Sequence, residues 1–220
     1  MKPAIQSVAE QVYNRLLDEI VKGARPAGDK LSEEHVCASL GVSRTPAREA
    51  LMRLHRDGLV ERFPRRGCFV KSQDAAEIAE LFECRAWLEC LALEQGFDDI
   101  PDEALGGLER ALKPGAALTR AASLKADDRL HALIIEACPN RHLREVAGQM
   151  LLRTYPFRFW RTHSGAPVGA VSRERLAIVR AIRRGDRAAA SRLLREHILR
   201  GREMILKNAA RRAAAGGGGA

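Results

Sequence analysis

The stretch GVSRTPAREALMRLHRDGLV, residues 41–60, decides the fold of the N-terminal part of the chain. Gly41 ends one helical pattern, and Ser43 is a suitable N-cap for the next helix, which is expected from residue 44 to about residue 57. Pro46 lies in the first turn of that helix, where a missing amide N–H costs nothing. Two helices joined by a short turn that contains glycine predict a helix-turn-helix.

The flanking segments extend this unit into a winged helix. Residues 7–22 carry apolar side chains at helical spacing, so they predict a preceding helix. The helix before Gly41 is expected to start at Ser32, after a turn over residues 24–31. Further along the chain, residues 59–62 and 68–71 predict two short strands joined as a hairpin. A helix, a helix-turn-helix and a hairpin together indicate a winged helix-turn-helix domain.

Arginine and hydroxyl side chains gather at the start of the helix from residue 44 and at the tip of the hairpin. Recognition helices contact base edges with their N-terminal residues, and arginine can donate two hydrogen bonds to one guanine. Glycine at a wing tip lets the backbone come close to the minor groove. The candidate DNA-binding residues are Ser43, Arg44, Thr45, Arg48, Arg65, Arg66 and Gly67. The alternative is a three-helix domain with an ordinary charged surface.

The distribution of charge supports a boundary after the hairpin. The chain has a net charge of +9, which favours polyanionic partners such as nucleic acid. Residues 43–71 carry eight Lys and Arg against three Asp and Glu, whereas residues 72–103 carry one against ten. We therefore expect a DNA-binding domain at residues 1–71, a second domain at 72–210 and a disordered low-complexity tail at 211–220.

Composition excludes several classes of protein. Hydrophobic residues make up 46% and charged residues 30% of the 220 residues, so the chain can bury a core and keep a polar surface. No stretch approaches the roughly 18 consecutive apolar residues that span a membrane. The N-terminus lacks the apolar segment of a secretory signal, and five cysteines without a CxxC pair argue against a disulfide framework. We expect a cytoplasmic protein with no membrane partner.

After residue 72 the pattern is helical nearly to the end and predicts a bundle of six helices, so the fold is expected to be mainly α. Three polar features should face inward. Asp127 and His131 are four residues apart on one helix face, His197 lies on the last helix, and Arg85 and Glu89 are four residues apart on the first. An Asp, two His and a nearby Arg could hold a divalent metal and an anionic ligand. Alternatively, each histidine is an ordinary, partly buried one.

The stretch LSEEHVCASLGVSRTPAREALMRLHRDGLVERFPRRGCFV resembles the winged helix of bacterial transcription regulators of the GntR family. The resemblance implies DNA contacts at the residues named above from the recognition helix and the wing tip. Some relatives place an arginine in the second helix against DNA, whereas residues 33–35 here are Glu, Glu and His. That contact is expected to be absent.

The segments ECRAWLE, DDRLH with NRHL, and AIRRGD with REHI resemble the FCD effector domain of the FadR subfamily, in its shorter, VanR-like branch. The resemblance implies an effector site and, in many members, a metal held by one Asp and three His. Asp127, His131 and His197 fill three of those places, and Arg175 fills the fourth. The implied effector-binding residues are Arg85, Asp127, His131, Arg175 and His197.

Arg175 leaves two possibilities for this site, because arginine stays protonated and cannot ligate a metal. Either Asp127, His131 and His197 keep a zinc or nickel ion, or the Arg175 cation replaces the metal and pairs with Asp127 or with the carboxylate of the effector. The second is favoured, since a cation beside a divalent ion is repelled.

The first functional hypothesis is a homodimeric repressor that binds a pseudo-palindromic operator in double-stranded DNA. By the resemblance, its effector is a small organic acid. The apolar stripes of the first and fourth bundle helices suggest the dimer interface.

A second hypothesis is a metal-dependent enzyme that uses Asp127, His131 and His197. The chain lacks HExxH and phosphate-loop motifs, so we expect no enzyme. A third is a ligand-independent architectural DNA-binding protein, which leaves the large helical domain unexplained.

Overall fold

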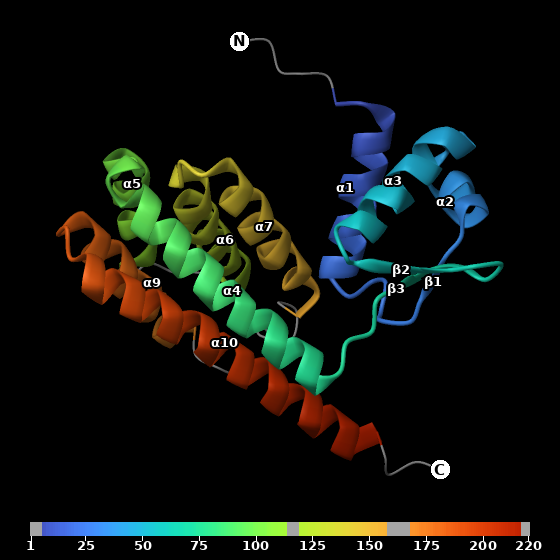
Figure 1. Ribbon diagram of the computed structural model, residues 1–220. Helices are drawn as coiled ribbons and strands as arrows, with labels where there is room; N and C mark the ends of the chain where they lie inside the picture. Colours follow the sequence, from blue (N-terminus) through green and yellow to red (C-terminus); the bar gives the residue numbers. More distant parts are fainter. Residues whose placement is uncertain (1–5, 114–118, 158–167, 217–220) are drawn as a thin grey trace. The chain divides into compact units, whose positions relative to one another are not determined.

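The computed structural model describes residues 6–113, 119–157 and 168–216, and the chain divides after Asp74 into two compact units (Figure 1). The N-terminal unit contains three helices and a three-stranded antiparallel sheet in the order β1-β3-β2. Its elements are α1 (Val8–Val21), β1 (Lys30–Leu31), α2 (Glu33–Leu40), α3 (Arg44–Arg56), β2 (Val60–Phe63) and β3 (Gly67–Val70). The predicted winged helix-turn-helix is confirmed.

Local signals in the sequence explain where these helices begin and end. The hydroxyl oxygens of Ser7 and Ser32 accept hydrogen bonds from backbone N–H groups three residues on, at 3.1 Å each, and so cap α1 and α2. Gly41 follows α2 with φ of 66°, a left-handed conformation that favours glycine. The apolar faces of α1 and α3 then pack together, and Leu16 and Leu54 are at most 1% exposed.

Strand β1 is the element of this unit that the sequence pattern did not predict. The turn expected over residues 24–31 ends in a strand of two residues, in which Lys30 pairs with Phe69 and Leu31 pairs with Cys68. Two residues are too few to show the alternation that marks a strand. The strand exists because the edge of β3 offers it hydrogen-bonding partners.

The second unit is helical, as predicted. Its described residues form α4 (Ala75–Gly96), α5 (Asp102–Leu112), α6 (Arg120–Ala137), α7 (Arg141–Arg153), α9 (Val168–Arg183) and α10 (Arg187–Gly216), with short 3₁₀ turns at Phe97–Asp99 and Tyr155–Phe157. Helix α4 contacts α6, α7 and α10 and runs between α7 and α10 in Figure 1. The core consists of apolar side chains, of which the following are at most 1% exposed: Phe82, Leu93, Leu130, Ile134, Ile178 and Leu194.

Helix α10 continues to Gly216, beyond residue 210, where the sequence pattern placed its end. Alanine is the strongest helix former, and residues 209–215 consist of alanine and arginine only. Residues 211–216 of the predicted tail are therefore helical, and its last part, residues 217–220, lies outside the described residues. Among the described helices, none is long and apolar enough to cross a membrane.

Candidate functional site

A cluster of charged and polar side chains is buried inside the helical unit. Its members come from α4, α6, α9 and α10 and are at most 3% exposed: Arg85, Glu89, Asp127, His131, Arg175 and His197. Burying a charge is expensive unless it is paired and hydrogen-bonded. The sequence analysis named five of these six residues as effector-binding candidates, and the structure brings them together with Glu89.

Glu89 joins Arg85 to His131. Arg85 lies one turn earlier on α4, and its Nε donates to Glu89 Oε1 at 2.5 Å. Nδ1 of His131, on α6, contacts Glu89 Oε2 at 2.5 Å. Burial alone would raise the pKa of Glu89, but the attraction of Arg85 and His131 lowers it to about 2. The carboxylate is therefore ionised at neutral pH and can only accept, so His131 donates to it through Nδ1.

Asp127 is the centre of the other half of the cluster. Its Oδ1 accepts a hydrogen bond from Arg175 Nε at 2.8 Å and lies 3.1 Å from His197 Nε2. Arg175 Nη1 donates in addition to the carbonyl oxygen and the hydroxyl of Ser123, at 3.0 and 2.8 Å. The Arg175 guanidinium, from α9, is therefore tied to two residues of α6.

His197 is held on its far side by Glu174. His197 Nδ1 lies 3.2 Å from Glu174 Oε2, and Arg200 Nη1 donates to Glu174 Oε1 at 2.5 Å. Burial would raise the pKa of Glu174, but hydrogen bonds from His197 and Arg200 outweigh it and lower the pKa. Carboxylates thus contact Nδ1 of both His131 and His197, which leaves each Nε2 directed toward Asp127.

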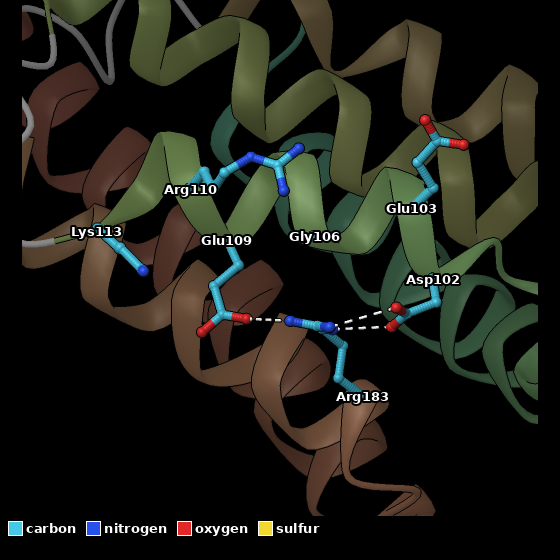
Figure 2. A pocket seen from close by; sticks show the side chains of 7 residues that line it. All are labelled: Asp102, Glu103, Gly106, Glu109, Arg110, Lys113 and Arg183. Atoms are coloured by element: carbon cyan, nitrogen blue, oxygen red, sulfur yellow. Dashed lines mark hydrogen bonds and ion pairs between the residues drawn. The ribbon is translucent and has the colours of Figure 1, made fainter.

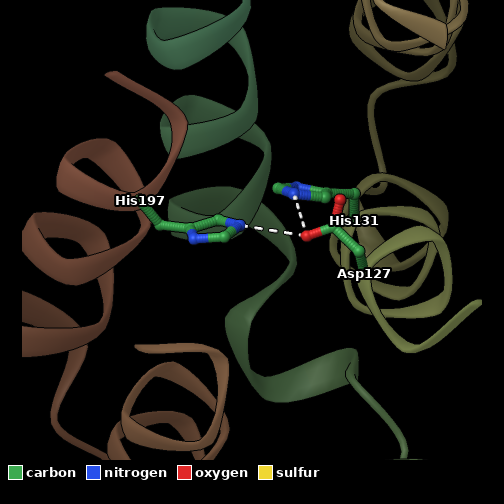
Figure 3. Close-up of side chains that lie close together, drawn as sticks. All are labelled: Asp127, His131 and His197. Carbon is green, nitrogen blue, oxygen red and sulfur yellow. Dashed lines mark hydrogen bonds and ion pairs between the residues drawn. The ribbon is translucent and has the colours of Figure 1, made fainter. Parts of the chain in front are cut away.

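Asp127, His131 and His197 form a candidate metal site. One ligand atom of each lies within 4.8 Å of the others, and Figure 3 shows both histidine rings directed at the Asp127 carboxylate. A carboxylate on the far nitrogen of a histidine is the usual support for a metal ligand. Arg175, which fills the fourth place of the family pattern in the sequence, donates to Asp127 Oδ1, the atom at which the two histidines converge. Three side chains therefore offer ligand atoms that could hold a metal, and a cation is hydrogen-bonded to one of these atoms.

Two buried polar atoms of the cluster have no hydrogen-bond partner among the described residues: Arg85 Nη2 and His131 Nε2. Arg85 Nη1 donates to Thr154 Oγ1 at 3.3 Å, so the other end nitrogen of the same guanidinium is left over. A buried donor without a partner costs free energy, and such an atom in a native structure calls for an explanation.

The predicted DNA-binding residues lie at two places in the N-terminal unit. Ser43, Arg44, Thr45 and Arg48 are exposed at the start of α3. Ser43 occupies the N-cap position of α3. Among the described residues, however, its hydroxyl makes no capping hydrogen bond. The hydroxyl therefore remains available to a phosphate group.

Arg65 and Arg66 lie in the turn between β2 and β3, and Gly67 is the first residue of β3. Arg65 has φ of 61° and Gly67 has φ of 99°. A positive φ is uncommon for any residue with a side chain and is enriched at functional sites. Arg66 lies over the rings of Phe63 and Phe69, at 5.7 and 5.8 Å from their centres. The two aromatic rings thus support the arginine at the wing tip.

Glu33 is a residue of this face that the sequence analysis did not place with the recognition helix. Its Oε1 and Oε2 accept hydrogen bonds from Nε and Nη2 of Arg48, at 2.9 and 3.0 Å. The hydrogen bond from Arg48 lowers the pKa of Glu33, and the positive charges of Arg62 and Arg44 lower it further. Arg62, on β2, is therefore a further basic residue whose charge acts on Glu33. Glu33 and Arg48 are fifteen positions apart in the sequence, so no helical or strand spacing could reveal their contact.

A surface hollow of about 390 Å³ lies on the helical unit, away from the predicted residues (Figure 2). Its charged groups largely satisfy one another, since Arg183 of α9 donates to Asp102 at 2.8 Å and to Glu109 at 2.5 Å. The hydrogen bonds from Arg183 lower the pKa of Asp102, and those from Arg180 and Arg183 lower the pKa of Glu109. These ion pairs connect α5 to α9. None of the charged side chains that line the hollow is buried, so it offers no buried polar group to a ligand.

Comparison with known families and proteins covers both units. The family described as bacterial regulatory proteins, gntR family, matches residues 8–70, and the FCD domain matches residues 80–200. A regulator from Bacillus subtilis (strain 168), the uncharacterized HTH-type transcriptional regulator YdhC, is 31% identical over 62% of this chain and 63% of its own length. The HTH-type transcriptional repressor RspR of Escherichia coli (strain K12) is 25% identical over 88% of this chain and 86% of its own.

Solved structures show the same fold. E. coli McbR/YncC superposes with a TM-score of 0.77 at 20% identity, over 92% of this chain and 99% of its own. The FCD domain of TM0439 is 26% identical and is known in two forms. Its metal-free form covers 63% of this chain and 98% of its own, with a TM-score of 0.56, and its Zn²⁺-bound form covers 62% and 96%, with a TM-score of 0.54.

Proposed function

This chain belongs to the GntR family of bacterial regulatory proteins and carries an FCD domain, so it is a DNA-binding transcription regulator, and we propose that a small organic acid in the buried site controls its binding to an operator. We further propose that it acts in the cytoplasm as a homodimeric repressor of the FadR subfamily on a pseudo-palindromic site. A relative named as a repressor, RspR, supports the direction of regulation.

The observation that carries the effector proposal is the pair of buried atoms without partners, Arg85 Nη2 and His131 Nε2. A carboxylate is the natural partner for a guanidinium nitrogen, because the charged hydrogen bond is stronger than a neutral one. His131 Nε2 can hydrogen-bond to a hydroxyl group of the ligand in either state of the ring, because it donates when protonated and accepts when neutral. Small acids that also carry a hydroxyl group therefore suit the site.

A thermal-shift screen of small carboxylates, with sugars and metal ions in the same panel, tests this proposal. A ligand at 100 times its Kd should stabilise the protein by about 2.7 kcal/mol. The variant Arg85→Lys keeps a cation beside Glu89 but moves the end nitrogen, so the shift from the same acid should be lost. An equal shift in Arg85→Lys, or no shift with any acid of the panel, would contradict the role of Arg85. The second outcome, no shift with any acid of the panel, would also favour a ligand-independent DNA-binding protein.

For the metal question, we propose that the Arg175 cation replaces the ion that the Zn²⁺-bound FCD domain of TM0439 holds. Arg175 already supplies positive charge to Asp127 at 2.8 Å, and a dication next to it would be repelled. The competing proposal, a zinc or nickel ion on Asp127, His131 and His197, rests on the convergence of these three ligand atoms. We also propose that the protein is not an enzyme, since the carboxylates of this cluster are engaged in ion pairs rather than poised as bases.

A homodimer is supported by exposed apolar side chains on the two helices that the sequence analysis suggested. On α4, Trp87 is 60% and Leu91 is 43% exposed, and on α7 Val146 is 42% exposed. Large apolar side chains in the open commonly mark an interface. Trp87→Glu should shift the protein from about twice its chain mass of 24.2 kDa toward the monomer in sedimentation velocity. Glu80→Gln, at an exposed position of the same helix, should stay dimeric, and a dimeric Trp87→Glu would place the interface elsewhere.

The wing should contribute affinity that depends on salt. The double variant Arg65→Ala/Arg66→Ala removes two exposed charges, so the slope of log K against log salt concentration should flatten by up to about two units. The double variant Arg129→Ala/Arg192→Ala removes the same charge from the helical unit and should leave the slope unchanged. Fluorescence anisotropy with a labelled duplex over a salt series measures both slopes. An unaltered slope in the wing variant would mean that the wing does not contact DNA.

A further inference from the structure

Arg48 was expected to present its guanidinium directly to DNA, but a carboxylate already holds one side of it. Glu33 lies in the first turn of α2, and both of its oxygens accept from Arg48 on α3, at 2.9 and 3.0 Å. The pair is open to solvent, since the Arg48 side chain is 62% exposed. The contact therefore fixes the direction of Arg48 without burying it.

The atoms in this contact determine which edge of Arg48 remains. A guanidinium is planar, with five N–H groups in a fixed fork. Glu33 takes the side edge formed by Nε and Nη2, which leaves the end edge formed by Nη1 and the second N–H of Nη2. That end edge carries two parallel N–H groups, the pattern that pairs with O6 and N7 of guanine. One arginine can thus bind Glu33 and a guanine at the same time.

The charge of Glu33 points to a role in specificity rather than in raw affinity. Glu33 lies among arginines, and its pKa is lowered by the Arg48 hydrogen bond and by the charges of Arg62 and Arg44, so it stays ionised at neutral pH. A negative charge on this face repels phosphate groups of every DNA sequence equally. Through its two hydrogen bonds to Arg48, however, it acts on a side chain that can read bases.

We propose that Glu33 is a positioning residue that determines sequence specificity: it holds the side edge of Arg48 so that the end edge meets a guanine in the major groove. The Arg48 side chain has several rotatable bonds. Without the Glu33 carboxylate to hold it, its guanidinium can turn to a phosphate group instead of a base. The orientation of Arg48 in the free protein then sets the base preference at one position of each half-site.

The test selects binding sites for the full-length protein from a randomised DNA duplex library. Arg48→Ala first identifies the base pair whose preference depends on Arg48. At that base pair, Glu33→Gln should lower the discrimination between the preferred base and the others by about fivefold, a modest effect because the ion pair is exposed to solvent. The other positions of the selected site should keep their preferences. Glu34→Gln, an exposed neighbour with the same change of charge, should select the same site as the unaltered protein.

Glu33→Asp separates orientation from simple charge. Aspartate keeps the negative charge but is one methylene shorter, so it should fail to hold both Arg48 nitrogens and should relax the same base pair as Glu33→Gln. If Glu33→Asp selects like the unaltered protein while Glu33→Gln does not, charge alone acts and the positioning role is wrong. The proposal is equally overturned if Glu33→Gln keeps full preference at the Arg48 position, or if Arg48→Ala changes no base preference.

Discussion

Arg175→His is expected to give a protein that holds close to one zinc or nickel ion per chain, whereas the unaltered protein should carry little metal. The substitution removes the cation from Asp127 Oδ1 and adds a fourth ligand beside Asp127, His131 and His197. Imidazole is a good ligand for both ions. Glu89 and Glu174 already hold Nδ1 of the two native histidines, so the support that a metal site needs is in place.

Metal analysis of protein purified without chelator or metal-affinity resin measures this gain. Arg180→His is the matched control, because Arg180 lies on the same helix but pairs with Glu109 on the exposed face at 2.9 Å. That variant should stay free of metal. Near-stoichiometric metal in the unaltered protein would show that Asp127, His131 and His197 suffice. The proposal that Arg175 replaces the ion would then be wrong.

Glu89→Ala is expected to lower the free energy of unfolding by about 3–5 kcal/mol, the usual cost of removing one partner from a buried ion pair. The change leaves Arg85, which is 2% exposed, without its carboxylate, and it removes the acceptor of His131 Nδ1. Urea denaturation followed by circular dichroism measures the loss. Glu80→Ala, an exposed glutamate on the same helix, should cost much less.

A double variant distinguishes a lost pair from lost packing. Glu89→Leu together with Arg85→Met replaces the pair by apolar side chains, and such replacements are often neutral or stabilising. The double variant should therefore be more stable than Glu89→Ala. A double variant as unstable as the single one would mean that the shape of these side chains, rather than their charge, supports the fold.

Much of the fold could be predicted because its signals are local. Ser7, Ser32 and Gly41 act on the residues next to them, so their roles as helix boundaries follow from the order of residues alone. Strand β1 could not be predicted, since Lys30 and Leu31 become a strand only through partners about forty residues away. The continuation of α10 to Gly216 was missed because a low-complexity composition suggested disorder, although alanine favours a helix.

The candidate site, like the fold, could be predicted from the sequence only in part. The four-residue spacing of Asp127 and His131 already placed them on one helix face, and the departure from the family pattern at Arg175 was visible in the residue type. The packing of α4, α6, α9 and α10 decided what these residues contact. It joined Glu89 to His131 and Arg175 to Asp127, and in the N-terminal unit it joined Glu33 to Arg48.

The sequence by itself determined the two domain types, the recognition helix, the wing and the residue types of the buried cluster. Only the tertiary structure decided that Arg48 is held by Glu33 and that Asp127 already has a cation at 2.8 Å. The two kinds of interaction differ in how far apart along the chain their partners lie. Caps, turns and helical periodicity depend on neighbours within about four residues. Ion pairs between helices depend on distances of a few ångströms that arise only when separate apolar faces pack together.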